Sequence, residues 1–406
     1  GMDGPITYSR SEDAGAIWNI THSILPGYDS TLYAAGVGAD AYAIDAIGTN
    51  VAIVAGGITE DWAIWKSTDN GTTFTKIIVS DFPFDNYDDV NSITDVDMDG
   101  YADTVLTTDG KMAILIDNNG MIHTWAGAML VLDQVIADPL SLFLSTDGLL
   151  YWNEGMGANP PVSIAESPDL DMNGTLDFAY DYVPRYGNGG QTTQPRAGID
   201  ANGNIVVSYV TLIENTTSGN PSPGDFSYRN NFLIASDDNG ANWFNPYNVG
   251  NSNYDECVYA SIPRNLNSNC VDVVWQQDAL PGIAVQAPNG DQSLHPFSNN
   301  DIFHDCVDIN LLFVGVNEIE NPSLSIGTYP NPATDELTIS VNLEHNEELS
   351  FDVINTIGQT VLSIDETNYA SGKSSFSINV KDLEDGIYLI RANSQNYSNT
   401  IKFIKN

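Results

Sequence analysis

Two short loops carry oxygen-bearing side chains at alternate positions, and each has a glycine where its chain must bend. The oxygen-bearing positions are Asp95, Asp97, Asp99 and Asp103 in one loop and Asp169, Asp171, Asn173 and Asp177 in the other. Calcium takes about six to eight oxygen ligands, and a glycine allows the tight bend that gathers them. We therefore expect both loops to bind calcium in a structural role. The alternative is that they are polar hairpins that bind nothing.

Arginines are the other side chains that could recognise a ligand, because a guanidinium can hold a carboxylate through two parallel hydrogen bonds. Residues 1–316 contain Arg10, Arg185, Arg196, Arg229 and Arg264. Arg196 and Arg264 each follow a proline and are tentative ligand-binding residues, with Glu154 as a tentative partner. In so acidic a chain each arginine is better explained as a structural ion-pair residue. No catalytic residue is predicted.

The pattern Ser-x-Asp-x-Gly-x-x-aromatic occurs three times. Its copies are Ser11, Asp13, Gly15 and Trp18; Ser67, Asp69, Gly71 and Phe74; and Ser236, Asp238, Gly240 and Trp243. Ser and Asp side chains can accept hydrogen bonds from the backbone N–H groups of a tight turn, and glycine supplies the positive φ that ends it. The aromatic residue then begins the returning strand, and we expect its ring to enter the core.

This pattern resembles the Asp box of sialidase-like β-propellers with BNR repeats, in which it is a structural turn outside the catalytic site. The copies start 56 residues apart (67 − 11) and then 169 apart (236 − 67), close to three times the first interval. With blades of roughly 40–50 residues, the resemblance predicts about six blades in residues 1–316, within a range of about five to seven. Because the first copy starts at Ser11, we expect the first blade to be truncated. The Arg-Ile-Pro signature of sialidases is absent, so sialidase activity is not expected.

The composition is strongly acidic, with 13 basic against 54 acidic residues and a formal charge of −41. Such a field repels nucleic acid and anionic lipid, so neither is an expected partner. Frequent turn residues and the lack of apolar helical spacing predict an all-β fold. No apolar run is long enough for a membrane-spanning helix. Three cysteines, Cys257, Cys270 and Cys306, predict one disulfide and one free thiol, with the pairing left open.

The pattern changes at residues 317–328, which read as a linker, and residues 329–406 form alternating strands separated by glycine turns. Four motifs mark this segment in order: Tyr329-Pro-Asn-Pro, Asn355-x-x-Gly-Gln, Leu383-x-x-Gly-Ile-Tyr and Lys402-x-x-Lys. The strand pattern predicts a small Ig-like β-sandwich. The motifs closely resemble the C-terminal sorting domain of type IX secretion substrates in Bacteroidetes. The resemblance implies export, recognition by the type IX translocon, and an extracellular or outer cell-surface location.

These observations predict a secreted or cell-surface binding protein whose propeller engages a glycan, a polymer or another surface protein. One alternative is an exo-acting glycoside hydrolase of sialidase-like fold. A second alternative is a structural component of a surface lattice or filament bridged by divalent ions. An enzyme is the less favoured interpretation because no convincing catalytic set assembles. A propeller supports many unrelated functions, so the fold alone does not identify the ligand.

Overall fold

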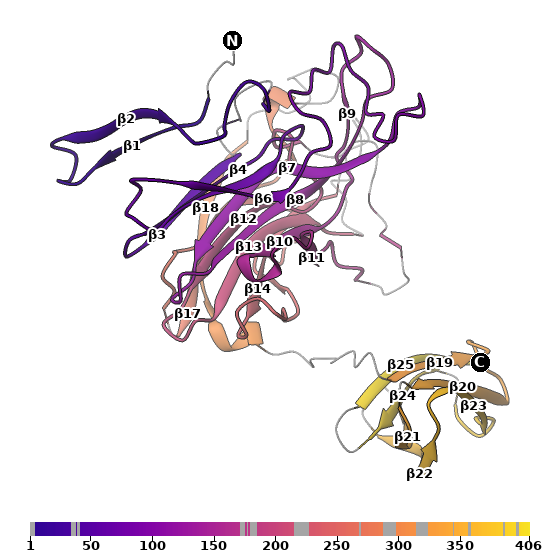
Figure 1. Cartoon of the computed structure of the whole chain (residues 1–406). Helices are drawn as coiled ribbons and strands as arrows, with labels where there is room; N and C mark the ends of the chain where they lie inside the picture. Colours follow the sequence, from indigo (N-terminus) through magenta and orange to yellow (C-terminus); the bar gives the residue numbers. More distant parts are fainter. Residues whose placement is uncertain are drawn as a thin grey trace. The chain divides into compact units, whose positions relative to one another are not determined.

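The computed structural model describes residues 5–33, 38, 41–170, 175, 176, 178, 185–214, 227–267, 269–286, 298–313, 324–343, 345–355, 359–384, 386–394 and 398–406. The chain divides into a first unit, residues 1–315, and a second unit, residues 316–406. Both consist of antiparallel β-sheets (Figure 1), and helical turns among the described residues are short 3-10 segments. The predicted all-β fold class is confirmed. No helix in the described residues is long and apolar enough to cross a membrane.

The described residues of the first unit form five sheets that follow one another along the chain, numbered here in that order. The first sheet pairs β1 (Thr7–Ser11) with β2 (Trp18–Ile24), and the second has the order β3 (Tyr42–Ile47), β4 (Asn50–Ala55), β5 (Trp62–Ser67), β6 (Thr75–Ser80). The third has the order β7 (Val105–Ile116), β8 (Ile122–Leu132), β10 (Leu149–Asn153), β11 (Val162–Ala165), with β9 (Ser141–Phe143) also on β8. The fourth is β12 (Thr193–Ile199), β13 (Ile205–Leu212), β14 (Arg229–Ser236), β15 (Tyr247–Asn248). The fifth is β16 (Glu256–Ser261), β17 (Cys270–Asp278), β18 (Asp301–Asp308). Short 3-10 turns are η1 (Glu154–Met156), η2 (Ala284–Gln286) and η5 (Ile309–Phe313).

The second to fifth sheets pack face to face in chain order through β-branched, aliphatic and aromatic side chains. Trp62 and Ile64 of the second sheet share a core with Ile122 and Leu150 of the third. Similar cores join the third sheet to the fourth and the fourth to the fifth. The first strands of neighbouring sheets also lie together, β3 with β7, β7 with β12 and β12 with β16. Every residue of β13 and β14 is buried, because neighbouring sheets cover both faces of the fourth sheet. This explains why apolar and polar residues do not alternate along these two strands.

The three Ser-x-Asp-x-Gly turns have the same hydrogen bonds. In each, the serine hydroxyl donates to the aspartate and accepts from the glycine N–H, over 2.8 to 2.9 Å. The glycines have φ of +90°, +73° and +83°, which a side chain would strain. The turns join β1 to β2, β5 to β6 and β14 to β15.

Two expectations about these turns were wrong. Trp18 does not enter the core: its side chain is 53% exposed, because the β1–β2 hairpin extends away from the other sheets (Figure 1). Phe74 and Trp243 do pack against buried residues. The 169 residues from Ser67 to Ser236 lead from the second sheet to the fourth, which is an advance of two sheets in the described part of the chain. The spacing had predicted an advance of three. Long connections before β7 and before β12 account for the extra length.

The cysteines pair as Cys270 with Cys306, which joins β17 to β18. Cys257 on β16 is a buried free thiol. Burial raises the pKa of the Cys257 thiol to about 12, so it stays protonated at neutral pH and behaves as a core side chain. The predicted count of one disulfide and one free thiol therefore agrees with the structure.

The described residues of the second unit form two sheets over one core. One sheet is β19 (Leu324–Tyr329), β20 (Glu336–Leu343), β23 (Gly372–Asn379), and the other is β22 (Thr360–Tyr369), β21 (Glu347–Asn355), β24 (Gly386–Asn393), β25 (Ser398–Lys405). Leu337 and Ile339 of the first sheet share a buried cluster with Phe351, Ile390 and Phe403 of the second. This unit is therefore a small antiparallel sandwich.

Candidate functional site

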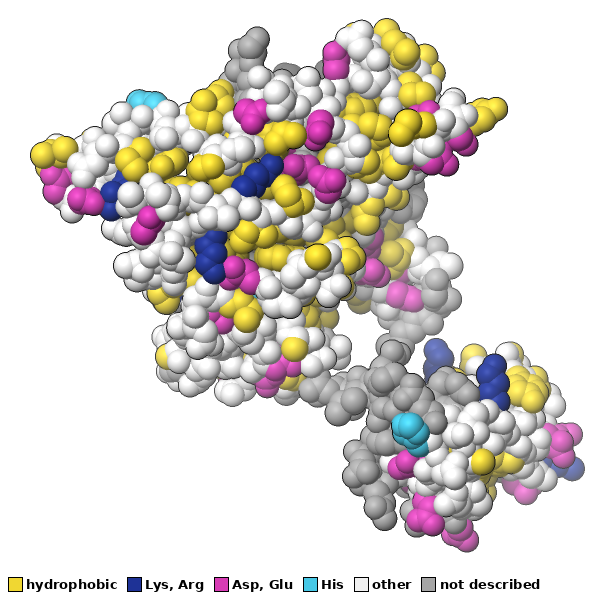
Figure 2. Space-filling view, in the orientation of Figure 1, with side chains coloured by type: hydrophobic (Ala, Val, Ile, Leu, Met, Phe, Trp, Pro, Cys, Tyr) yellow, Lys and Arg dark blue, Asp and Glu magenta, His cyan; other side chains and the backbone are white. Residues whose placement is uncertain are grey.

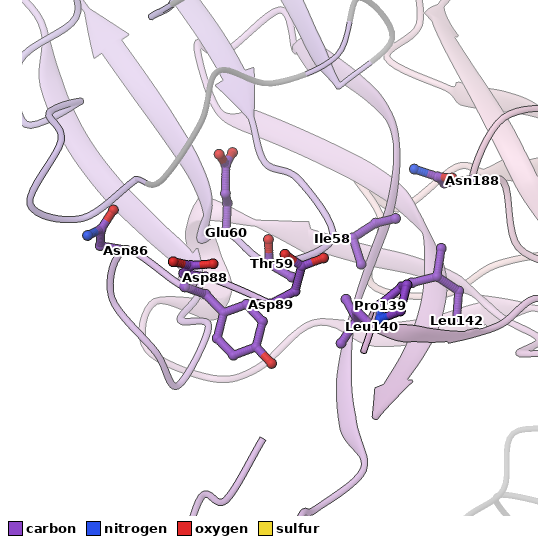
Figure 3. Close-up of a pocket in the computed structure, with 11 residues that line it drawn as sticks. Ile58, Thr59, Glu60, Asn86, Asp88, Asp89, Pro139, Leu140, Leu142 and Asn188 are labelled. Carbon is purple, nitrogen blue, oxygen red and sulfur yellow. The ribbon is translucent and has the colours of Figure 1, made fainter. Parts of the chain in front are cut away.

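A pocket of about 610 Å³ lies among connections of the first unit, and we call it the acidic pocket (Figure 3). Its lining comes from the β4–β5 connection, the β6–β7 connection, the segment around β9, and Asn188 before β12. The lining residues are Ile58, Thr59, Glu60, Asn86, Tyr87, Asp88, Asp89, Pro139, Leu140, Leu142 and Asn188. Loops held by rigid strands can vary in sequence without disturbing the sheets, which makes this a suitable place for a binding site.

The pocket has two chemically different sides. Figure 3 shows Glu60, Asp88 and Asp89 together on one side, and Ile58, Leu140 and other apolar side chains on the other. Carboxylates accept hydrogen bonds from hydroxyl groups, and apolar side chains cover C–H surfaces. The pocket is therefore suited to a ligand that has both hydroxyl groups and an apolar face.

Glu60 is the unusual carboxyl of this pocket. It is buried, and its Oε2 has no hydrogen-bond partner among the described residues. Burial, and then the neighbouring charge of Asp61, raises the pKa of Glu60 to about 7. A carboxyl with this pKa carries a proton much of the time at neutral pH and can donate it.

Asp88 and Asp89 differ from Glu60 because both are exposed. Asp88 accepts a hydrogen bond from Asn91 Nδ2 over 2.6 Å and another from the Val90 N–H over 3.0 Å. These bonds, led by the one from Asn91, lower the pKa of Asp88. Tyr87, which precedes Asp88, is buried and donates its hydroxyl hydrogen to Asp133 over 2.6 Å, which anchors the loop to the end of β8. The pocket thus combines a protonatable buried acid with an ionised exposed one.

Arg196 and Arg264 line one cavity of about 300 Å³, which we call the arginine cavity. Arg264 donates to both carboxylate oxygens of Asp45 on β3, over 2.7 and 3.0 Å. It also donates to the Ile116 carbonyl over 2.7 Å. Arg196 on β12 is exposed, and its Nη1 donates to the Pro195 carbonyl. The structure therefore brings the two tentative ligand-binding arginines together.

Glu154 does not join them. Its carboxylate oxygens accept from Lys66 Nζ over 2.7 and 2.8 Å, and Oε2 also accepts from the Ile122 N–H over 3.0 Å. These bonds tie the second sheet to the third. Glu154 is absent from the described lining of both the acidic pocket and the arginine cavity. Its contacts are those of a structural ion pair.

The first predicted calcium loop lies in the connection between β6 and β7. Carboxylate oxygens of Asp95, Asp97 and Asp99 lie within 4.8 Å of one another. Asp95 also accepts from the Gly100 N–H over 2.9 Å, and Gly100 has φ of +92°. Asp103 Oδ2 accepts from the Val96 N–H over 2.8 Å and so closes the loop. The donor set, all hard oxygen on a tight bend, fits a calcium ion.

The second predicted loop falls largely outside the described residues. Asp169 is described, whereas Asp171, Asn173 and Asp177 lie outside. The geometry of this loop therefore stays a prediction.

Glu60, Asp88 and Asp89 were missed at the sequence level. Single carboxylates in polar connections are common in a chain with 54 acidic residues. Glu60 follows the apolar strand β4 and a Gly56-Gly57 pair, which marks a tight connection at a strand end. That signal marks a loop; only the folded chain shows that this loop and the β6–β7 connection share a pocket.

Residues 327–406 match the family model described as "Secretion system C-terminal sorting domain". The match confirms the sorting domain that the sequence motifs indicated and identifies a secreted or cell-surface protein. No curated protein matches the chain.

Several solved structures are similar to the chain. A protein of unknown function from Dyadobacter fermentans has 12% identity and a TM-score of 0.34, with 93% of this chain and 96% of that chain covered. A sialidase from Trypanosoma rangeli has 9% identity and a TM-score of 0.30, with 90% and 53% covered. A bifunctional GH43-CE protein from Bacteroides eggerthii has 8% identity and a TM-score of 0.29, with 95% and 53% covered. Likenesses this weak carry no argument about the activity of this chain.

Proposed function

We propose that the first unit of this secreted or cell-surface protein is a β-propeller that binds a glycan in the acidic pocket. The described sheets follow one another along the chain, the second to fifth pack face to face, and the first strands of these four lie together, as blades do. In the second and fourth sheets the Asp-box turn joins the third and fourth strands. The blade count stays a prediction of about six, within a range of about five to seven.

The observation that carries the glycan proposal is the pairing of a polar and an apolar side in one pocket. Sugar rings present hydroxyl groups at their edges and C–H groups on their faces. Asp88 and Asp89 would accept hydrogen bonds from hydroxyl groups, while Leu140 and Leu142 would cover a ring face. The net charge of −41 opposes anionic sugars, so the expected ligand is neutral.

A binding screen of the full chain against neutral oligosaccharides, followed by calorimetry, tests this proposal. Asp89→Asn should weaken the binding of any captured glycan by about tenfold, because an amide replaces a carboxyl group and loses one acceptor oxygen. Asp365→Asn, an exposed acid of the second unit, is the matched control and should bind as the unaltered chain does. Equal binding by both variants would remove the acidic pocket from consideration.

Glycoside hydrolysis is the second candidate, and the buried Glu60 with its raised pKa favours it. Glu60 would donate its proton to the glycosidic oxygen as the bond from that oxygen to the anomeric carbon breaks. Asp88 or Asp89 would stabilise the developing positive charge or activate a water molecule. The products would be two sugars, with the water supplying the new hydroxyl group.

One variant separates binding from hydrolysis. Glu60→Gln keeps the shape of the side chain but has no proton to donate. If the protein hydrolyses the glycan it binds, this variant should lose turnover by at least about a hundredfold while still binding. A chain that binds but shows no turnover supports the binding protein alone.

Calcium is proposed as a structural ion of the first loop, held by Asp95, Asp97 and Asp99. The matched positions Asp169, Asp171, Asn173 and Asp177 are proposed as a second site on sequence grounds. The sorting domain implies handling by the type IX secretion system. Direct recognition of residues 329–406 by the translocon is part of the proposal.

A further inference from the structure

The disulfide between Cys270 and Cys306 lies beside an aspartate and a histidine on the same two strands. Cys270 and Asp272 are two positions apart on β17, and His304 and Cys306 are two positions apart on β18. The strands pair in continuous antiparallel register, in which Asp272 is directly opposite Cys306. Side chains two positions apart on a strand point to the same face of the sheet. All four side chains therefore lie on one face of the fifth sheet.

This face is the one turned away from the core. Val271 and Val273, on the opposite face of β17, belong to the buried cluster between the fourth and fifth sheets. By contrast, the side chains of His304 and Asp272 are 56% and 48% exposed, and Cys306 is exposed as well. Solvent, and a small ion or reductant dissolved in it, therefore reaches this side of the disulfide.

The distances among the donor atoms are close to those of a zinc site. Sγ of Cys270, Sγ of Cys306 and a carboxylate oxygen of Asp272 lie within 4.8 Å of one another. His304 Nε2 and Asp272 Oδ1 are 2.9 Å apart. A tetrahedral zinc ion, with bonds of about 2.3 Å to sulfur and about 2.0–2.2 Å to nitrogen and oxygen, holds two sulfurs about 3.8 Å apart and a nitrogen and an oxygen about 3.3 Å apart. The imidazole and the carboxylate already have nearly this spacing, and the sulfurs can reach it by rotating about their Cα–Cβ bonds once the bond between them is broken.

The kinds of donor select the metal. Acidic side chains lie at many places on the face of the first unit that Figure 2 shows, in a chain of charge −41, so carboxylates alone do not distinguish one divalent cation from another. Two thiolates and an imidazole do, because sulfur and nitrogen ligands favour zinc over calcium and magnesium. Together with Asp272 they supply the four ligands of a tetrahedral shell.

We propose that the Cys270–Cys306 disulfide and a zinc ion are alternatives at this face, and that reduction of the disulfide creates a zinc site of Cys270, Cys306, Asp272 and His304. A dithiol reduces the bond by exchange: its own sulfurs form a disulfide, and its two hydrogens pass to the cysteines. Zinc then binds both cysteines as thiolates, and two protons are released.

Two features of the fifth sheet favour this exchange. Exposed disulfides are the more readily reduced ones, and Cys306 is exposed. The continuous pairing of β17 with β18 holds the four side chains on one face without help from the sulfur–sulfur bond. The site is separate from the acidic pocket and the calcium loops, and it does not depend on the proposed glycan.

The test uses cobalt(II), a coloured substitute for zinc, on the full chain. The chain is first reduced with a phosphine, which takes an oxygen from water to become a phosphine oxide and is then removed under nitrogen. We expect the reduced chain to bind cobalt with a thiolate-to-cobalt charge-transfer band and the visible bands of a tetrahedral ion, and zinc to displace the cobalt. The oxidised chain should show neither band. The Asp95 loop cannot produce the charge-transfer band, because its ligands are all oxygen.

Matched variants assign the ligands. Cys306→Ser should remove the charge-transfer band, whereas Cys257→Ser, the same change at the buried free thiol, should keep it. His304→Gln should weaken zinc binding by at least about tenfold. His345→Gln, at an exposed histidine of the second unit, should bind zinc as the unaltered chain does.

Several results would overturn the inference. One is a reduced chain without the charge-transfer band, and another is a band that depends on Cys257. Zinc affinity unchanged by both His304→Gln and Asp272→Asn would also do so, since the two thiolates alone would then hold the ion. Zinc should raise the melting temperature of the reduced chain above that of reduced Cys306→Ser, because an ion bound only to the folded chain stabilises it. If reduction alone unfolds the first unit, zinc must restore its fold for the inference to stand.

Discussion

Arg264 and Asp45, 219 positions apart in the chain, form a two-pronged ion pair with N–O distances of 2.7 and 3.0 Å. Asp45 lies on β3 and Arg264 follows β16, so the pair connects the second sheet to the fifth. The Ile116 N–H donates to Asp45, and the Ile116 carbonyl accepts from Arg264. One ion pair therefore ties three sheets together at the end of β7.

The first prediction concerns the stability that this pair provides. Arg264→Met should lower the free energy of unfolding of the first unit by about 2–4 kcal/mol, because the Asp45 side chain is only 9% exposed and would lose its charged partner. All 7 tryptophans lie between Trp18 and Trp275, so tryptophan fluorescence in a denaturant titration of the full chain reports the first unit alone.

The double variant Asp45→Asn with Arg264→Met is the control for that prediction. It leaves no unpaired buried carboxylate and should recover part of the loss. If the single and double variants are equally stable, the pair contributes little and the sheets are held by apolar packing.

The second prediction concerns calcium. Saturating calcium should raise the melting temperature of the first unit by several degrees relative to chelator, since an ion bound only to the folded chain stabilises it by mass action. Asp97→Asn should remove most of the shift contributed by the first loop. Asp301→Asn, an exposed acid on β18, should leave it unchanged. An identical melting temperature in calcium and chelator would mean that neither loop holds the ion.

The third prediction concerns acid stability and His123, a fully buried residue of β8. Burial lowers the pKa of His123 to about 4, and Asp117 at 3.8 Å only partly offsets this. The unfolded chain has the higher histidine pKa, so it binds the proton first and stability falls as pH drops from about 6.5 to about 4. The loss should reach about 3 kcal/mol.

His123→Gln provides the comparison. Buried Glu60, Glu256 and Asp109 have raised pKa values and act in the opposite sense, because their contribution is lost as pH rises. Subtracting the unfolding free energy of His123→Gln from that of the unaltered chain at each pH removes the contribution of these three carboxyl groups, because both proteins contain them. The pH dependence that remains is due to His123. A difference that does not change with pH would show that His123 is charged in the folded protein.

The fourth prediction concerns Glu60 in the absence of ligand. Its folded pKa of about 7 lies above the unfolded value, so the carboxyl favours the folded state at low pH and opposes it once ionised. Glu60→Gln should therefore be neutral for stability at pH 5 and stabilising at pH 8, by up to about 3 kcal/mol. The melting temperature at the two pH values measures this. A variant that destabilises equally at both would mean that Glu60 is held ionised.

The sequence predicted the elements whose signals are local. Ser236, Asp238 and Gly240 specify their turn within a few residues, because each bond in it spans at most four positions. The motifs of the sorting domain are likewise contiguous. The number of sheets between two such turns could not be predicted from the turn residues, because it depends on the lengths of the connections between strands. Trp18 shows the same limit: its turn was recognised, but whether a sheet covers the ring depends on its neighbours.

By itself, then, the sequence determined an acidic, exported, all-β chain with Asp-box turns and a sorting domain, because composition, turn chemistry and short motifs act over a few residues. Only the tertiary structure decided which polar side chains meet. Glu60 and Asp89 come from different connections, and Arg196 lies on β12 whereas Arg264 follows β16. Their proximity follows from how the sheets pack, and packing depends on apolar contacts between residues far apart in the chain.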